Sequence, residues 1–171
     1  MRATASQVVD TRFSLIRTFD VVVPQDNDHA THLERFKAAH EGEFCYYSRL
    51  LTDANFAKTP AFTPGRRFLV KAFRIGQRVV SDDCLAQLKR VKATLVGAQG
   101  IALAYEQKIS EFPKNRWSIS FDEKDNLPLV GDVHCVPLMH RRRDGGVEFC
   151  ICEFERVWND YYILLAFCDP E

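Results

Sequence analysis

The side chains best suited to metal chemistry are His134, His140, Cys150 and Cys152, which lie on either side of a glycine-containing turn. Imidazole nitrogens and thiolate sulfurs are the ligands that Zn²⁺ prefers in proteins. In an antiparallel hairpin, residues of like parity share one face, so these side chains could meet. The spacing is Cys-x-Cys rather than the Cys-x-x-Cys of zinc knuckles, and alternating cysteines on an apolar strand commonly pack into a core. The residue types thus support a zinc-dependent hydrolase only as the alternative hypothesis for function. Because the spacing argues against a zinc site, we assign no cofactor.

Three consecutive arginines beside His140 form a basic tip at residues 141–143. Guanidinium groups bind phosphate through paired hydrogen bonds, so Arg142 is a candidate ligand-binding residue. The alternative is a solvated turn whose charges protect a strand edge. Lysine plus arginine number 23, as do aspartate plus glutamate, so no overall field attracts nucleic acid and we do not expect it as a partner. The aromatic residues that could stack on a ligand here are Phe149, Trp117 and Tyr161.

A second candidate surface combines the turn around Trp158 with the polar loop 122–128. The turn mixes aromatic bulk with polar tips, as binding surfaces do, although Trp158 and one of the tyrosines could equally belong to the core. No segment places a nucleophile, a base and an orienting group at a spacing that a reaction demands. The leading interpretation is therefore a non-enzymatic domain that binds a ligand or a protein. Its candidate ligand-binding residues are Trp158, Asn159, Asp160, Tyr161, Asp122 and Asp125, together with Arg142.

Three further histidines, His29, His32 and His40, could share one side of a helix that begins near Asp28. A zinc site on that helix would need additional ligands from elsewhere in the chain, and nothing in the sequence points to one. We therefore expect them to be exposed helix histidines.

Length and composition predict one globular domain over residues 1–171, with residues 1–12 as a flexible N-terminal arm. Hydrophobic residues make up 46% of the chain and include 13 phenylalanines, which is typical of a packed core. Phe-rich strands could also form a seam with a second copy of the chain. The start lacks the apolar segment of a signal peptide and no run is long enough to cross a membrane. We therefore expect a cytoplasmic protein with reduced cysteines and no membrane partner.

The segment 65–106 organises the elements that must position these residues. Alternating apolar residues predict a central strand over 66–75. Ser81 and two following aspartates predict a helix start, and Thr94 predicts another, in which Gly97 and Gly100 admit a neighbouring strand closely.

Further strands are expected over 13–23, 116–121, 133–141, 147–154 and 161–168, with a hairpin turn at the Asp-Gly step between the third and fourth of these. A helix from Asp28 should end at Gly42, and a helical or mixed segment, EFCYYSRLL, should follow. This order predicts an α+β fold with an antiparallel or mixed sheet and two consecutive short helices after a central strand.

The chain from about Phe19 to Phe167 resembles a group of small bacterial proteins of uncharacterised function that are known from metagenomic sequences. The segments that carry the resemblance are FDVVV, LLTDANF, VKAFRIGQRVVSDDCLAQL, the ATL helix start, EFP and VWNDYYILLAF. This resemblance implies an architecture and no activity.

The C-terminal two-thirds also looks C-type-lectin-like, because a strand and two helices precede short strands around a long loop. Trp158, Asn159 and Asp160 spell the WND of calcium-dependent sugar-binding members, in which the Asn and Asp are calcium ligands. The Glu-Pro-Asn motif that accompanies WND in those members is absent, and only the loop residues Asp122, Glu123, Asp125 and Asn126 could replace it. The resemblance thus implies a calcium-dependent ligand site at the turn and the loop.

Overall fold

One mixed sheet carries the fold in the computed structural model, which describes residues 10–171. The strands follow the order β1-β3-β8-β4-β6-β7-β2, and β5 pairs with β6 outside this path. The strands are β1 Phe13–Val22, β2 Phe44–Tyr47, β3 Arg67–Ile75, β4 Arg116–Ile119, β5 Leu129–Val130, β6 Val133–Arg141, β7 Val147–Glu153 and β8 Tyr162–Cys168. The helices are α1 His32–Ala39, α2 Ser81–Arg90 and α3 Gly97–Lys108, with short 3₁₀ turns η1 His29–Thr31, η2 Ile109–Glu111 and η3 Lys124–Asn126. The predicted α+β class with a mixed sheet and two consecutive helices after the strand at 66–75, which is β3, is confirmed, although β3 lies next to the edge strand β1 and not at the centre of the sheet.

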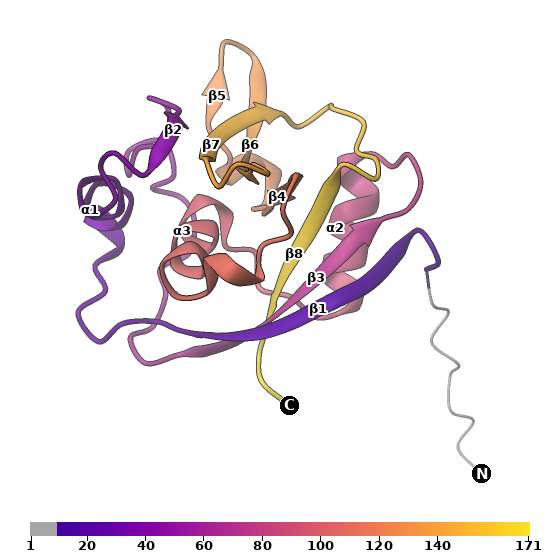
Figure 1. Cartoon of the computed structure of the whole chain (residues 1–171), viewed down its shortest axis with the longest axis horizontal. Coiled ribbons are helices and arrows are strands. Elements are labelled where there is room, and N and C mark those ends of the chain that lie inside the picture. The colour runs from indigo at the N-terminus through magenta and orange to yellow at the C-terminus, as the bar shows by residue number, and fades with distance from the viewer. Residues whose placement is uncertain (1–9) are drawn as a thin grey trace.

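The strand β8 lies inside the sheet, between β3 and β4, and all seven of its residues are buried. It pairs antiparallel with β3 and parallel with β4. Alternate β8 side chains enter two separate cores: Leu165 and Phe167 pack with α1 and α3, whereas Leu164 and Ala166 pack with Cys84 and Leu88 of α2. The sheet is therefore covered by α1 and α3 on one face and by α2 on the other (Figure 1).

The edge strand β1 contributes to both cores because a bulge between Leu15 and Arg17 reverses its alternation. Phe13 packs on the α2 side, whereas Phe19 and Val21 pack on the α3 side. One extra residue turns every later side chain to the opposite face. The first residues of the predicted N-terminal arm lie outside the described residues, but Asp10 and Arg12 are described, and Arg12 contacts Asp83 of α2 at 2.9 Å.

The helix α3 begins later than the sequence predicts. Thr94 does not cap it but forms an isolated bridge with Phe167 of β8, and the helix starts at Gly97, which has a φ of +51°. A Cβ at Gly100 would collide with Cγ2 of Val96 and lie 3.2 Å from the Phe167 ring of β8, and one at Gly97 would meet Thr59 and Asp122. The residue just before the helix and two loops, more than a neighbouring strand, therefore require these glycines. Ser81 is likewise the first residue of α2 rather than its cap, because its hydroxyl is used in the core.

The helix α1 is capped from a distance. Asp28 caps only the turn η1, where its carboxylate accepts from the N–H of Ala30 at 3.1 Å. The first turn of α1 donates instead to Asp53, whose two oxygens accept from the N–H groups of Leu33 and Glu34 at 2.8 and 2.9 Å. A carboxylate at this position accepts from backbone N–H groups that have no partner within the helix. Its negative charge also interacts favourably with the positive end of the helix dipole. The segment after Gly42, expected to be helical or mixed, is the strand β2, which runs parallel to β7.

The prediction of exposed helix histidines is wrong: His29 and His40 are half-buried, and His32 is only 8% exposed and packs edge-on against Phe62. Burial lowers the pKa of His32 from 6.5 to about 4. The unfolded chain therefore takes up a proton at His32 at a higher pH than the folded chain does.

We expect the stability that neutral His32 contributes to be complete above pH 6.5 and to be lost as the pH falls towards 4. The difference amounts to about 3 kcal/mol of unfolding free energy. Urea denaturation between pH 7 and 4 measures this loss, which should be absent from a His32→Leu variant and retained when half-buried His134 is replaced by Gln. An equal loss in wild type and His32→Leu would show that His32 is not the group responsible.

Candidate functional site

A row of functional side chains crosses four strands at the end of the sheet furthest from β1. In the strand register, Trp117 on β4 lies opposite His140 on β6, His140 opposite Glu148 on β7, and Glu148 opposite Tyr46 on β2. Directly paired residues face the same side of a sheet. This is the α2 face, but Trp117 is only partly buried against the α2 core, and Tyr46 is 53% exposed. Helix α2 therefore does not extend over this row of side chains, which is left partly open to solvent.

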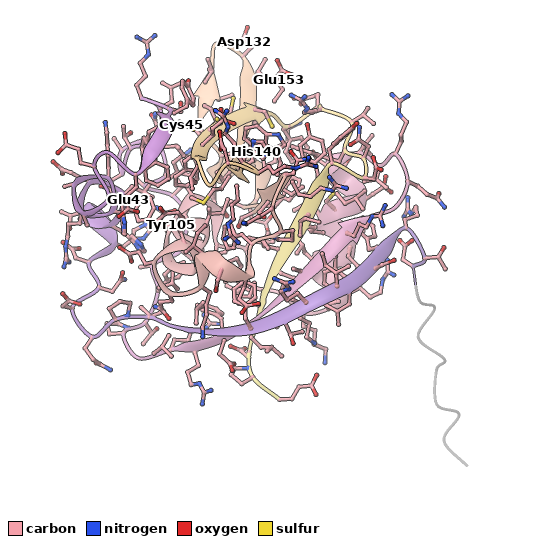
Figure 2. The ribbon with its side chains drawn as sticks, in the orientation of Figure 1. Glu43, Cys45, Tyr105, Asp132, His140 and Glu153 are labelled. Carbon is pink, nitrogen blue, oxygen red and sulfur yellow. The ribbon has the colours of Figure 1, made fainter. Side chains whose placement is uncertain are left out.

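His140 is held on two sides within the row. Its ring stacks on Trp117 with centroids 4.6 Å apart and planes 19° apart. Its Nδ1 lies 2.9 Å from Oε2 of Glu148, so this nitrogen carries the proton and donates to the carboxylate. Stacking and hydrogen bonding together fix the orientation of the imidazole. Figure 2 shows His140 at this end of the sheet, with Cys45 of β2 nearby in the view.

A hollow of about 410 Å³ adjoins the row at the turn between β6 and β7, lined by Asn115, His140, Arg142, Arg143 and Asp144. The turn closes through the N–H of Arg142, which donates to the carbonyl of Gly146 at 2.8 Å, and Gly145 adopts a φ of +91°. The predicted hairpin and its basic tip are confirmed. The guanidinium of Arg142 contacts Asp144 at 3.0 Å and the Cys45 sulfur at 3.8 Å, and the contact with Cys45 raises the pKa of Arg142.

Arg143 is the less restrained of the two arginines. It is exposed and makes none of the ion pairs found within residues 10–171. One residue along β4 from Trp117, on the opposite face of the sheet, the Arg116 guanidinium lies 5.9 Å from the ring centroid of Tyr161, which is 61% exposed. The hollow thus combines exposed positive charge with the His140 ring, which is stacked on Trp117. Phe149, the other aromatic residue predicted for stacking, is wholly buried and cannot serve.

The four residues of the zinc hypothesis do not converge. His134 and His140 share a face of β6 but are six residues apart, about 20 Å along an extended strand. Cys150 lies opposite Leu138, and Cys152 lies opposite Val136. Burial raises the pKa of Cys150 to about 11 and that of Cys152 to about 12, so both are thiols at neutral pH. Among residues 10–171, no three His, Cys, Asp or Glu side chains are arranged to hold a metal ion.

The second predicted surface is corrected by the burial of Trp158, which is 0% exposed. Its ring packs against Phe121 and Tyr162, and its Nε1–H donates to the Ser81 hydroxyl at 2.9 Å. That hydroxyl donates in turn to the carbonyl of Phe154. Trp158 is therefore a core residue that joins α2 to the segment before β8.

Asp122 is also buried rather than available to a ligand. One of its oxygens accepts from the N–H of Glu123 at 2.7 Å and from the Asn126 amide at 3.1 Å, and the other faces Gly97 at the start of α3. The positive end of that helix stabilises the carboxylate. Among the other predicted residues, Asn159 accepts from the N–H of Tyr161 within its own turn, and Asp125 and Asp160 are exposed.

Three residues of the site were missed by sequence reasoning: Glu148, Tyr46 and Cys45. Glu148 had a usable signal, because a hairpin centred on Asp144 places it opposite His140. Tyr46 and Cys45 had none, because β2 reaches β7 through a parallel pairing about a hundred residues away in the chain.

No helix within residues 10–171 has the length and apolar character needed to cross a membrane.

We expect Ser81→Ala to destabilise the protein by roughly 1–3 kcal/mol, because it leaves the buried Trp158 N–H and Phe154 carbonyl without partners. Urea denaturation measures the change, and Ser110→Ala, at an exposed serine, should have almost no effect. A Ser81→Ala protein as stable as wild type would contradict the buried position of Trp158.

Comparison of the chain with protein-family models, with curated proteins and with solved structures finds no match. Its function is therefore argued from the geometry of the site.

Proposed function

We propose that this chain is a binding domain whose ligand is a small molecule with a flat ring and a negatively charged group. The ligand occupies the hollow at the β6–β7 turn and extends onto the adjoining aromatic surface. The observation that carries the proposal is the meeting of the exposed Arg142 and Arg143 guanidinium groups with the stacked rings of His140 and Trp117 at one uncovered end of the sheet.

The charge at the hollow favours an anion. Arg142 and Arg143 line it, and both are exposed. Only one carboxylate, that of Asp144, lines the same hollow, and it already pairs with Arg142. Guanidinium groups bind phosphate or carboxylate with two parallel hydrogen bonds, which supplies both affinity and orientation.

The rings favour a planar group. The His140 ring lines the hollow and stacks on Trp117, and Tyr46, which is 53% exposed, lies in the same row on the far side of Glu148. Stacking of a flat ring on such a side chain contributes about 1–3 kcal/mol. Since His140 is already fixed by Trp117 and Glu148, it can make a hydrogen bond to the ligand without first losing side-chain freedom.

Three expectations stay predictions: the C-type-lectin-like arrangement, the calcium site at Asn159 and Asp160, and association with a second copy of the chain. Burial of Trp158 and Asp122 supports placing the ligand at the β6–β7 turn instead of at the WND turn. A protein segment with an acidic residue next to an aromatic residue carries the same two groups and would fit the same hollow.

Three probes separate the two parts of the proposed ligand: adenosine monophosphate has the ring and the charge, adenosine the ring alone, and inorganic phosphate the charge alone. Isothermal titration should show the tightest binding for adenosine monophosphate. Arg143→Gln should weaken that binding about tenfold, because a charge-assisted hydrogen bond contributes roughly 1.5–3 kcal/mol and this one is partly solvated.

The matched control is Arg74→Gln, which removes an exposed arginine from β3 and should leave binding unchanged. Equal loss in the two variants would indicate non-specific attraction to positive charge. No measurable binding of any probe at millimolar concentration would refute the proposal.

A further inference from the structure

A groove of about 430 Å³ lies on the other side of β2, between that strand and the C-terminal half of α1. Its walls include Phe44 and Tyr47 of β2, and its rim includes Glu34, Lys37, His40 and Glu41 of α1 and the turn that follows. The bulge in β2 between Phe44 and Tyr46 separates this groove from the row that contains Tyr46. The groove is thus distinct from the site at the β6–β7 turn.

The aromatic walls of the groove are rigid. The rings of Phe44 and Tyr47 meet edge-on with centroids 5.2 Å apart. Both pack against Phe36 of α1 and Phe149 of β7, at centroid distances between 5.5 and 6.5 Å. The face of an aromatic ring carries a negative partial charge that attracts cations. Two fixed half-buried rings therefore offer a binding surface for a cation whose outer atoms are apolar.

An ammonium group of the protein already uses this surface. The Nζ of Lys37 lies 5.4 Å from the ring centroid of Tyr47, within the range in which a cation is attracted to a ring face. Lys37 is exposed, so its ammonium can exchange this contact for water. The side chain therefore shows what kind of group the ring accepts.

The charges around the groove favour a positive ligand. Glu34 and Glu41 are exposed on its rim, against the single ammonium of Lys37. His40 is held by two further carboxylates: its Nδ1 lies 3.0 Å from Glu43 and its Nε2 lies 3.3 Å from Glu106 of α3. The Tyr105 hydroxyl donates to Glu43 at 2.6 Å, and Figure 2 shows these two residues next to each other. The carbonyl end of α1 adds negative partial charge at the same place.

We propose that this groove is a binding site for a small ligand with a quaternary ammonium group, which displaces Lys37 from Tyr47. Quaternary ammonium is cationic but has an apolar outline, so it gains from aromatic walls without losing hydrogen bonds to water. The volume matches that of small-molecule sites.

Choline and 3,3-dimethylbutan-1-ol test this inference, because they have the same shape and differ only in charge. Titration followed by ¹H–¹⁵N NMR should show saturable shifts around Phe44 and Tyr47 for choline, at least tenfold tighter than for the neutral alcohol. Lys37→Gln should tighten choline binding about two- to fivefold by removing the competing ammonium. Glu41→Gln should weaken it about two- to threefold, and both side chains are exposed, so both variants should fold.

Equal binding of choline and the alcohol would overturn the inference, as would weaker choline binding in Lys37→Gln or the absence of saturable shifts. Binding of adenosine monophosphate should be the same with and without choline, so failure at one site is distinguishable from failure at the other.

Discussion

Burial of both faces of β8 is the constraint on which the other elements depend. Its seven residues are all buried, and consecutive side chains point into different cores. Apolar surface on each face must be removed from water, which requires α2 on one side and α3 with α1 on the other. The two short helices that follow β3 fulfil this requirement in succession, because the chain crosses from one face to the other between α2 and α3 (Figure 1). Ser81 and Trp158 join α2 to the start of β8, and Thr94, just before α3, pairs with Phe167 of β8.

The uncovered end of the sheet follows from the same constraint. The helix α2 has ten residues, about 15 Å of length, and the core beneath it thins out at Trp117, Cys150 and Cys152, which are only partly buried. Charged and aromatic side chains can therefore remain accessible on β4, β6 and β7, where they rest on strands that are themselves held by β8. On the opposite face, Phe36 links α1 to β2 and β7, and the aromatic groove forms where that packing meets solvent. Both proposed sites thus lie at the edges of the two cores, on a rigid support.

Local patterns predicted the elements whose partners are near in sequence or whose apolar character is strong. Alternation identified β3 and β8, and the Asp-Gly step identified the β6–β7 hairpin, so His140 and the arginine tip were placed correctly. The strand β2 was not predicted, because four residues with a distant parallel partner show no periodicity. The cap of α1 was missed because it comes from Asp53, about twenty residues after the helix begins. Trp158 was assigned to a surface because its polar neighbours resemble a binding turn, and only tertiary packing reveals that its indole N–H is satisfied inside the core by Ser81.

The chain has two tryptophans, and the account gives them opposite environments: Trp158 in the α2 core and Trp117 at its uncovered edge. The most direct test is the quenching of tryptophan fluorescence by iodide in wild type and in Trp117→Phe, which leaves Trp158 as the only tryptophan. We predict that wild-type emission is partly quenched, whereas emission from the variant is blue-shifted and almost unaffected by iodide. Strong quenching of Trp158 in the folded variant would contradict the account, since it would place the WND turn, and not the row around His140, at the accessible end of the sheet.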